Sequence, residues 1–367
     1  MNPELLHQIA LTLINNVGAV HAKILLDHFG NAPDIFKAKL STLEKLEGIG
    51  TIRARAIKHF KDFEKAAAEI NFIEKFKITP IFLTDTSYPQ RLLNCYDPPT
   101  ILFYKGKADL NAAKIISVVG TRSNTDYGKM ITEKLISDLA QQDVLIISGL
   151  AYGIDTIAHK AALKNNLPTV GVVGHGLDVI YPTDNKQLAK EMIRQDGGIL
   201  TQFPSKTKPD RHNFPIRNRI VAGLADASII IETSIKGGSL ITAEMANGYN
   251  RDVFAVPGRI TDTHSGGSNY LIANNKAILL NSAGQLLELM GWEQKKKISK
   301  KVQKELFLNF SADEKIIVDI INSKEAVHID EIKLKSNISS SAIAAAMLNL
   351  EMQQVIRMLP GKMYTLN

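Results

Sequence analysis

The fold is decided by the stretch Ile115-Ile116-Ser117-Val118-Val119-Gly120-Thr121-Arg122. Its first five residues are almost uniformly apolar, which predicts a strand that is covered on both faces, as in a parallel sheet flanked by helices. A glycine, a hydroxyl and an arginine then follow where a helix is expected to open. Backbone amides, a hydroxyl and a guanidinium beside a helix N-terminus are typical of a phosphate site.

The same pattern recurs on both sides of this stretch. Apolar runs predict further strands at 144–147, 169–173, 199–201, 227–231 and 252–256, and helical patterns lie between them, for example at 127–141 and 239–249. This alternation predicts an α/β fold with a Rossmann-like parallel sheet as its core. Residues 78–114 carry Tyr88-Pro89, Pro98-Pro99 and Lys105-Gly106, and we expect them to be too irregular for a core element.

The first 77 residues contain a helical repeat. Asn16-Val17-Gly18 recurs 32 residues later as Gly48-Ile49-Gly50, each time followed by small and apolar residues at helical spacing. Residues 1–77 therefore resemble a tandem helix-hairpin-helix (SAM-like) domain. Two roles stay open for its glycine turns, which are contact with a DNA backbone and packing alone.

The C-terminal part is predicted to form a separate small domain. Residues 78–290 make up the Rossmann-like domain, and a basic linker at 291–309 follows, with six lysines against two acidic residues. Residues 310–367 show a winged-helix pattern, with helices at 312–322, 329–334 and 339–352 and a hairpin around Pro360-Gly361. The third helix contains no Lys or Arg, and the domain has six basic against seven acidic residues. It is therefore expected to bind protein or to pack rather than to read duplex DNA.

The composition excludes several classes of protein. A chain of 367 residues is expected to form two or three domains, and its net charge of +7 with a pI of about 9.2 suggests an anionic partner. Cys95 is the only cysteine, which excludes an internal disulfide and a cysteine-based zinc site and indicates a reducing cytoplasm. No run of eighteen apolar residues is present, and the N-terminus lacks a secretion signal, so we expect a cytoplasmic protein with no membrane contact.

The candidate site lies in the loops after the strands, because ligands of an open parallel sheet bind at the carboxyl ends of its strands. Most of these loops carry a cation beside a glycine or a hydroxyl, which predicts a track for successive phosphates. The candidate DNA-binding residues are Gly120, Thr121, Arg122, Ser148, Gly149, Gly174, Lys186, Arg217, Asn218, Arg219, Lys236, Gly237, Gly238 and Ser239. An alternative is structural pairing, of Arg217 and Arg219 with Asp226 or Glu232, and of Arg122 with Asp126 or a nearby carboxylate.

Seven motifs occur in a fixed order along the chain. They are Val119-Gly120-Thr121-Arg122, Ser148-Gly149-Leu150-Ala151, Gly153-Ile154-Asp155 with Ala158-His159, Gly176-Leu177-Asp178 with Tyr181-Pro182, Phe214-Pro215-Ile216-Arg217-Asn218-Arg219, Gly238-Ser239-Leu240-Ile241-Thr242-Ala243 and Val256-Pro257-Gly258. Over about residues 80–280 the chain closely resembles the DNA processing protein A (DprA, or Smf) family. The resemblance implies a homodimer that coats incoming single-stranded DNA in natural transformation and loads the recombinase RecA onto it.

The resemblance also implies roles for single residues. The phosphate-gripping arginine of the family falls on Arg122, and Lys186 is a substitute for the basic residue that the family has near its Tyr-Pro loop. Two stretches depart from the family, Thr201-Gln202 in place of the usual Ser-Glu and Lys276-Ala277 in place of Gly-Ala.

Other functions fit the sequence less well. Nucleoside-monophosphate phosphoribohydrolases of Rossmann-like fold use Pro-Gly-Gly-x-Gly-Thr-x-x-Glu, and the stretch from Lys236 to Glu244 lacks the proline and the Gly-Thr pair. Dehydrogenase and P-loop signatures are missing. Asp155 and His159 lie four residues apart and would suit a metal, but a helix-dipole role for the aspartate and packing against the sheet for the histidine are more usual. We therefore predict no catalytic residue, no cofactor and no metal.

Overall fold

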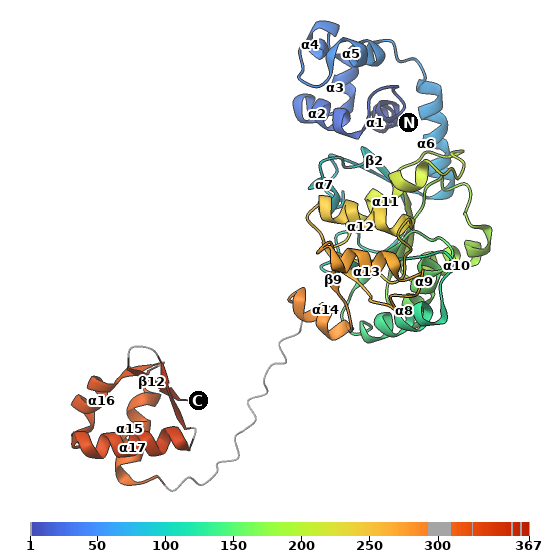
Figure 1. The fold of residues 1–367 in the computed structure, drawn as a ribbon. Coiled ribbons are helices and arrows are strands. Elements are labelled where there is room, and N and C mark those ends of the chain that lie inside the picture. The colour runs from blue at the N-terminus through green and yellow to red at the C-terminus, as the bar shows by residue number, and fades with distance from the viewer. Residues whose placement is uncertain (1, 293–309, 325, 354, 360–361, 367) are drawn as a thin grey trace. The chain divides into compact units, whose positions relative to one another are not determined.

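The computed structural model describes residues 2–292, 310–324, 326–353, 355–359 and 362–366. The chain divides into two compact units, Met1–Trp292 and Glu293–Asn367 (Figure 1). Nearly all of the predicted basic linker and the predicted turn at Pro360-Gly361 lie outside the described residues. Within the described ranges, no helix is both long and apolar enough to cross a membrane.

A nine-stranded sheet forms the centre of the first unit, in the order β1-β2-β6-β5-β4-β3-β7-β8-β9. All six predicted strands are present and run parallel to one another, which confirms the Rossmann-like prediction. They are β3 (Ile115–Val119), β4 (Leu145–Ser148), β5 (Thr169–Val172), β6 (Gly198–Thr201), β7 (Ala227–Ile230) and β8 (Asp252–Ala255). The chain moves outward from β3 to β6 and then returns to the other side of β3 as β7. The strand order therefore reverses between β3 and β7, where the loops diverge and leave a crevice.

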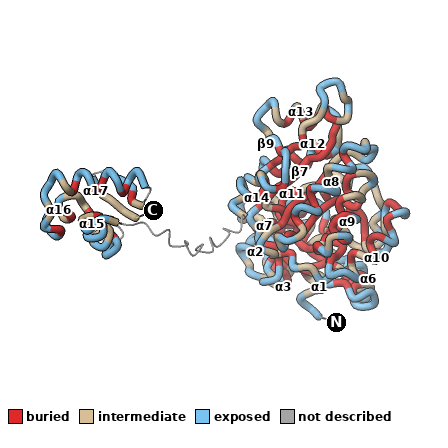
Figure 2. The backbone as a smooth tube through the Cα atoms, turned by 90° about the horizontal axis from the view of Figure 1, so that it is seen from below, coloured by how far each residue is buried: buried red, intermediate tan, exposed pale blue. Residues whose placement is uncertain are grey.

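Helices cover both faces of this sheet. They are α8 (Asp126–Asp138), α9 (Ile154–Lys164), α10 (Lys186–Arg194), α11 (Asn213–Leu224), α12 (Gly238–Gly248), α13 (Gly266–Ala273) and α14 (Ala283–Leu289). Successive residues of β3 alternate between two cores, because side chains of a strand point to opposite faces. Ile115 and Val119 belong to the core with α11 and α12, and Ile116 and Val118 to the core with α8, α9 and α14. Figure 2 shows the buried strands enclosed by helices whose outer faces are exposed.

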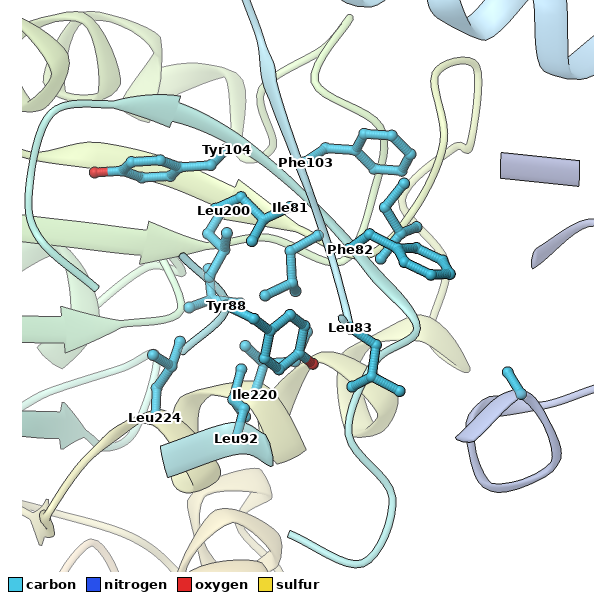
Figure 3. Packing of buried hydrophobic residues seen from close by; sticks show 14 of the residues in the cluster. Ile81, Phe82, Leu83, Tyr88, Leu92, Phe103, Tyr104, Leu200, Ile220 and Leu224 are labelled. Atoms are coloured by element: carbon cyan, nitrogen blue, oxygen red, sulfur yellow. The ribbon is translucent and has the colours of Figure 1, made fainter. Parts of the chain in front are cut away.

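The segment 78–114 contributes two strands to the sheet, so the prediction that it holds no core element is wrong. β1 (Thr79–Phe82) pairs antiparallel with β2 (Ile101–Gly106), and β2 pairs antiparallel with β6. Phe82, Tyr88, Leu92 and Phe103 pack around this edge with residues of β6 and α11 (Figure 3). The Tyr88 hydroxyl donates to the carbonyl of Pro99 at 2.6 Å, which satisfies the one polar atom of this buried side chain.

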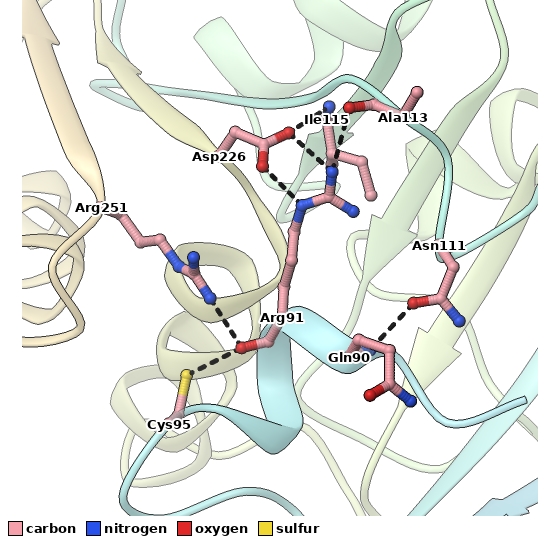
Figure 4. Close-up of polar contacts among 8 residues, drawn as sticks. All are labelled: Gln90, Arg91, Cys95, Asn111, Ala113, Ile115, Asp226 and Arg251. Atoms are coloured by element: carbon pink, nitrogen blue, oxygen red, sulfur yellow. Dashed lines mark hydrogen bonds and ion pairs between the residues drawn. The ribbon is translucent and has the colours of Figure 1, made fainter. Parts of the chain in front are cut away.

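A bidentate ion pair attaches this segment to the amino ends of the central strands (Figure 4). Arg91, in the short helix α7 (Gln90–Leu93), donates from Nε and Nη2 to the Asp226 carboxylate at 2.6 and 2.9 Å. The same carboxylate accepts the backbone N–H of Ile115. Asp226 is therefore a partner of Arg91 and of β3, not of Arg217 or Arg219 as the sequence suggested.

Six helices precede the sheet in the same compact unit. They are α1 (Pro3–Thr12), α2 (Ala19–Phe29), α3 (Ala32–Lys37), α4 (Leu40–Glu44), α5 (Gly50–Lys58) and α6 (Phe63–Phe76), and their core is continuous with that of the sheet (Figure 1). Gly48 and Gly50 have φ of +83° and +64°, a conformation that favours glycine. Arg53 donates to the carbonyls of Asn16, Gly48 and Ile49 and so joins the two repeated turns. A domain boundary at residue 77 stays a prediction.

The second unit has the predicted winged-helix arrangement. Helices α15 (Ala312–Asn322), α16 (Ile329–Ser336) and α17 (Ser340–Met352) surround a small apolar core. Strands β10 (Val327–His328), β11 (Ile356–Leu359) and β12 (Met363–Leu366) form an antiparallel sheet in the order β10-β12-β11.

Candidate nucleic-acid interface

Two adjoining cavities lie at the carboxyl ends of β5, β4, β3 and β7. The larger has a volume of about 430 Å³ and is lined by the loops after β3, β4 and β7 and by α11. The predicted residues that line it are Gly120, Thr121, Arg122, Gly149, Arg217, Asn218, Gly237, Gly238 and Ser239. The smaller cavity extends past Gly174 to Tyr181 and shares Arg122, Gly149 and Arg217 with the first. We call the two together the strand-end cleft.

Arg122 is exposed at the junction of the two cavities. Its Cζ lies 5.2 Å from the centre of the Phe214 ring, and that ring stacks on Tyr181 at 6.2 Å between centroids and 29° between planes. Among the described residues, no carboxylate lies within ion-pairing distance of the Arg122 guanidinium. The alternative pairing with Asp126 is therefore not formed. Instead the arginine presents an uncompensated positive charge beside two aromatic faces.

Glu232, two residues after the end of β7, holds both ends of the loop that carries Arg122. Its carbonyl accepts the N–H of Thr121 at 2.7 Å. Its carboxylate, 1% exposed, accepts the N–H of Thr125 at 3.0 Å and also a short hydrogen bond from the Thr125 hydroxyl. A Cβ on Gly128 would lie 2.2 Å from this carboxylate, so glycine is required there. Glu232 thus fixes the loop through these hydrogen bonds and does not pair with Arg217 or Arg219.

This arrangement changes the expected phosphate contact at the first loop. Thr125 caps α8 by accepting the N–H of Gly128, and the Glu232 carboxylate lies at the same helix terminus. A carboxylate at that position already uses the favourable helix dipole and would repel a second anion. The N-terminus of α8 is therefore not free to receive a phosphate, and the Arg122 side chain is the predicted phosphate-binding group that stays open at this loop.

Arg217 forms part of the cleft floor. It is 5% exposed, and its Nη1 donates to the carbonyl of Val172 at 2.7 Å. A Cβ on Gly149 would lie 1.8 Å from that nitrogen, so the β4 loop reaches Arg217 only because residue 149 is glycine. Burial lowers the pKa of Arg217 to about 10, Asp155 opposes that shift, and Arg122 adds to it, so the guanidinium stays charged at neutral pH.

Asp155, which begins the first turn of α9, supports the same floor. Its carboxylate accepts the N–H groups of Gly149 and Ala151 at 3.0 and 3.3 Å. Burial raises the pKa of Asp155, and the charge of Arg217 and these hydrogen bonds oppose the rise. The buried cation of Arg217 and the buried carboxylate of Asp155 thus compensate one another beneath the cleft.

Arg219 points away from the cleft. Its Nη1 donates to the carbonyl and the carboxylate of Asp97 at 2.6 and 3.1 Å, and its Nη2 donates to Gln202 at 2.7 Å. The sequence offered a structural pairing as an alternative for Arg219, and the structure shows such a pairing. The partners named for it, Asp226 or Glu232, are wrong. Gln202, which departs from the family pattern, serves here as an acceptor for Arg219.

Three further predicted residues lie outside the two cavities. Ser148 is buried and donates to the carbonyl of Val118 at 2.6 Å. Lys186 and Lys236 are exposed, at the start of α10 and in the loop before α12. Conversely, Tyr181, Phe214 and Arg211 line the cleft but were not among the predicted site residues. The signal that could have found the two aromatic residues is that each precedes a proline in a stretch that follows a strand, Tyr181 in the loop after β5 and Phe214 in the first turn of α11.

The histidine that was weighed as a metal ligand packs against the sheet instead. The Nδ1 of His159 lies 2.6 Å from the hydroxyl of Thr169, and that hydroxyl donates its proton to the carbonyl of Ile146. Nδ1 must therefore carry the proton and donate it. Burial lowers the pKa of His159 to about 3, with a smaller contribution from Arg217. Among the described residues, no group of three His, Cys, Asp or Glu side chains is placed to hold a metal ion.

The phosphoribohydrolase alternative places its essential glutamate at Glu244. This residue does not line the strand-end cleft, and its side chain is exposed and pairs with Lys276 at 3.4 Å. The geometry thus separates Glu244 from the glycine loop that would hold the phosphate.

Two family models and several known proteins are similar to this chain. The family model described as DNA recombination-mediator protein A matches residues 79–291, and the DprA winged helix domain matches residues 309–362. Protein Smf of Synechocystis sp. is 38% identical over 303 residues, which cover 79% of this chain and 73% of that protein. DNA processing protein DprA of Streptococcus pneumoniae is 42% identical over 216 residues, which cover 59% of this chain and 76% of that protein.

Two solved structures are similar as well. The X-ray structure of DprA from Streptococcus pneumoniae superimposes with a TM-score of 0.65 and 34% identity, covering 77% of this chain and 95% of that one. DprA from Helicobacter pylori, whose structure was described for its single-stranded DNA binding mode, gives a TM-score of 0.53 and 30% identity over 59% of this chain and 96% of that one.

Proposed function

This chain belongs to the DNA recombination-mediator protein A (DprA/Smf) family, and from that membership we propose that it binds single-stranded DNA in the strand-end cleft. The observation that carries the proposal is Arg122, an exposed cation that pairs with no carboxylate in the part of the chain that the structure describes. It lies over the ring of Phe214, which in turn stacks on Tyr181. The names of the relatives indicate DNA processing as the process that the binding serves, and we propose natural transformation as its setting.

The chemistry of the cleft favours a single strand over a duplex. Arginine neutralises the backbone phosphates, while Phe214 and Tyr181 offer faces on which an unpaired base stacks. Bases in a duplex are already stacked on one another and do not reach such faces. Because every base has an aromatic face and phosphates carry no sequence information, binding is expected to be nearly independent of sequence.

Two finer proposals concern partners. The family description names recombination mediation, which supports the loading of RecA onto the bound strand. A homodimer is supported by β9 (Ile278–Leu279), the last strand of the sheet, whose two residues are 42% and 40% exposed. An exposed apolar edge strand is a template for pairing with another chain.

Substituting Ile278 by Lys tests the dimer proposal. A charge on the edge strand blocks edge-to-edge pairing, so the variant is expected to sediment as a monomer while the parent sediments as a dimer. Ile260, which is 94% exposed and lies outside the strands of the sheet, provides the control substitution to Lys. A parent chain that is monomeric at micromolar concentration would remove the basis of this proposal.

A salt titration tests DNA binding itself. Fluorescence anisotropy with labelled oligonucleotides of equal length, single-stranded and duplex, is measured from low to moderate salt. The single strand is expected to bind more tightly throughout, with a logarithmic salt slope that counts the phosphates neutralised. Equal affinity for the two forms at moderate salt would contradict the proposal.

A further inference from the structure

The longest loop of the cleft edge, residues 202–212, connects β6 to α11 and is rich in cations. Lys206, Lys208 and Arg211 are exposed, and Arg211 lines the strand-end cleft. The loop leads directly into Asn213 and Phe214 at the start of α11. Its conformation therefore determines where one arginine and one aromatic ring of the cleft stand.

A residue of the N-terminal helices holds this loop from outside the sheet. Glu69 of α6 is 6% exposed, and its two carboxylate oxygens each lie 3.0 Å from the N–H of Ser205. The Ser205 hydroxyl donates to the same carboxylate at 2.5 Å. Among the described residues, no cation pairs with Glu69. A buried carboxylate is costly unless it is hydrogen-bonded, so this contact with Ser205 is specific and not incidental.

The next two residues of the loop are held from the other side. The Asp178 carboxylate accepts the N–H of Lys206 at 2.9 Å, and Gly176 donates its N–H to the carbonyl of Thr207 at 3.0 Å. Lys206 has a φ of +66°, a conformation that non-glycine residues rarely adopt. Such backbone strain persists only where the surrounding contacts fix it. Glu69 and Asp178 supply those contacts on the two flanks of one strained residue.

We propose that helix α6 positions the 202–212 loop for DNA, with Glu69 as the positioning residue. This inference rests on the proposed DNA-binding function and extends it to helix α6, which acts on affinity through the 202–212 loop. Loss of the Glu69 contact releases Ser205 and lets Lys206 relax out of its strained conformation. Arg211 and Phe214 then no longer stand where the cleft requires them.

The test compares two substitutions on one helix. Glu69→Gln replaces an acceptor of the Ser205 contact at nearly constant volume, and Glu64→Gln alters an exposed carboxylate of the same helix. Glu69→Gln is expected to weaken binding of a single-stranded oligonucleotide about threefold to tenfold, the range of an indirect coupling. Glu64→Gln is expected to bind like the parent. Asp178→Asn, which loosens the opposite flank, should reproduce the Glu69→Gln loss.

Two further measurements separate loop positioning from a general loss of stability. In the Glu69→Gln variant, trypsin is expected to cleave after Lys206 faster than in the parent, at an unchanged rate elsewhere in residues 2–292. Combined with Arg211→Ala, Glu69→Gln should weaken binding by less than the product of the two single effects, because both act through the same loop.

The outcomes distinguish this inference from the function on which it rests. If Arg122→Ala weakens DNA binding while Glu69→Gln and Asp178→Asn bind like the parent, the loop inference is overturned and the proposed function stands. Multiplicative effects of Glu69→Gln and Arg211→Ala would also overturn it. If Arg122→Ala and Arg211→Ala both bind like the parent, the proposed function fails first.

Discussion

Arg122 and Arg217 lie in the same cleft, yet their surroundings assign them different roles. Arg122 is exposed and free of carboxylates among the described residues, while Arg217 is buried against Asp155 and the carbonyl of Val172. Removing an exposed cation costs the folded protein little stability, because such a cation takes part in no internal ion pair. A buried one leaves its partners unsatisfied. The same kind of substitution therefore has opposite consequences at the two positions.

Arg122→Ala is expected to weaken single-stranded DNA binding about tenfold to a hundredfold, the value of a charged hydrogen bond to phosphate. The loss should be similar for all base sequences, and the salt slope should decrease by about one counterion. Arg122→Lys should restore part of the affinity, since a point charge lacks the forked contact. Equal melting temperatures of parent and variant are expected; unchanged affinity at unchanged melting temperature would show that the phosphate site is elsewhere.

Arg217→Ala should instead unfold more easily, by on the order of 3 kcal/mol in a urea titration, because Asp155 loses its neighbouring charge and Val172 its donor. Its DNA affinity should fall only in proportion to the unfolded fraction. A variant that unfolds like the parent but binds DNA weakly would make Arg217 a direct ligand.

The partners of single residues were the least predictable part of the site. The sequence placed the candidate loops at one sheet edge, and nine of the candidate residues line the larger cavity. It did not identify Asp97 as the partner of Arg219, because the two come together only through the packing of a segment that looked irregular. The N-terminus of α8 looked free for phosphate, because Glu232 reaches it from a strand more than 100 residues later.

At the scale of elements, prediction succeeded where a segment carries its own pattern. The six parallel strands are mostly apolar and were predicted to within one residue at each end. β1 and β2 were missed, because Pro80 and the Pro98-Pro99 turn interrupt the pattern and the strands are stabilised by pairing across distant sequence. Phe103 of β2 lies opposite Thr201 of β6, about a hundred residues away. Long-range pairing of this kind leaves no local signal.

The contact between α9 and β5 makes folding stability depend on pH. His159 is neutral in the folded protein down to a pKa of about 3, whereas its ordinary pKa is 6.5. As the pH falls below 6.5, the unfolded chain therefore binds a proton that the folded chain does not. The stabilisation is complete above pH 6.5 and is lost as the pH falls toward 3, by up to about 1.4 kcal/mol for each pH unit. His175, whose pKa burial also lowers, acts in the same direction.

Urea titrations between pH 7 and pH 4 check this expectation. His159→Asn removes the titrating ring and should flatten the dependence of unfolding free energy on pH, whatever its effect on stability at pH 7. His212→Asn, at an exposed ring, serves as the control and should keep the parental slope. A parental slope in His159→Asn would show that other groups cause the acid sensitivity.

At the scale of the whole molecule, the two compact units differ in what they offer to DNA. The strand-end cleft of the first unit combines Arg122, Arg211 and aromatic faces. In the second unit, α17 has no cation, and its exposed residues include Leu348 and Met352, which are 59% and 76% exposed. Six basic against seven acidic residues give residues 310–367 no net attraction for phosphate.

Ending the chain at residue 309 should therefore leave affinity for single-stranded DNA within a few-fold of the parent. The truncation keeps the six lysines of 291–309, so the comparison isolates the winged-helix unit. Ending the chain at residue 292 also removes those lysines. Any contribution of the lysines to the salt slope should be lost only in this shorter variant. The slope should then decrease by at most about 0.7 counterion for each lysine that contacts a phosphate. Both variants retain the whole first unit, so their melting temperatures should match that of its transition in the full chain. A loss of tenfold or more on removing 310–367 alone, equivalent to about 1.4 kcal/mol, would show that the winged-helix unit binds the strand despite its lack of charge.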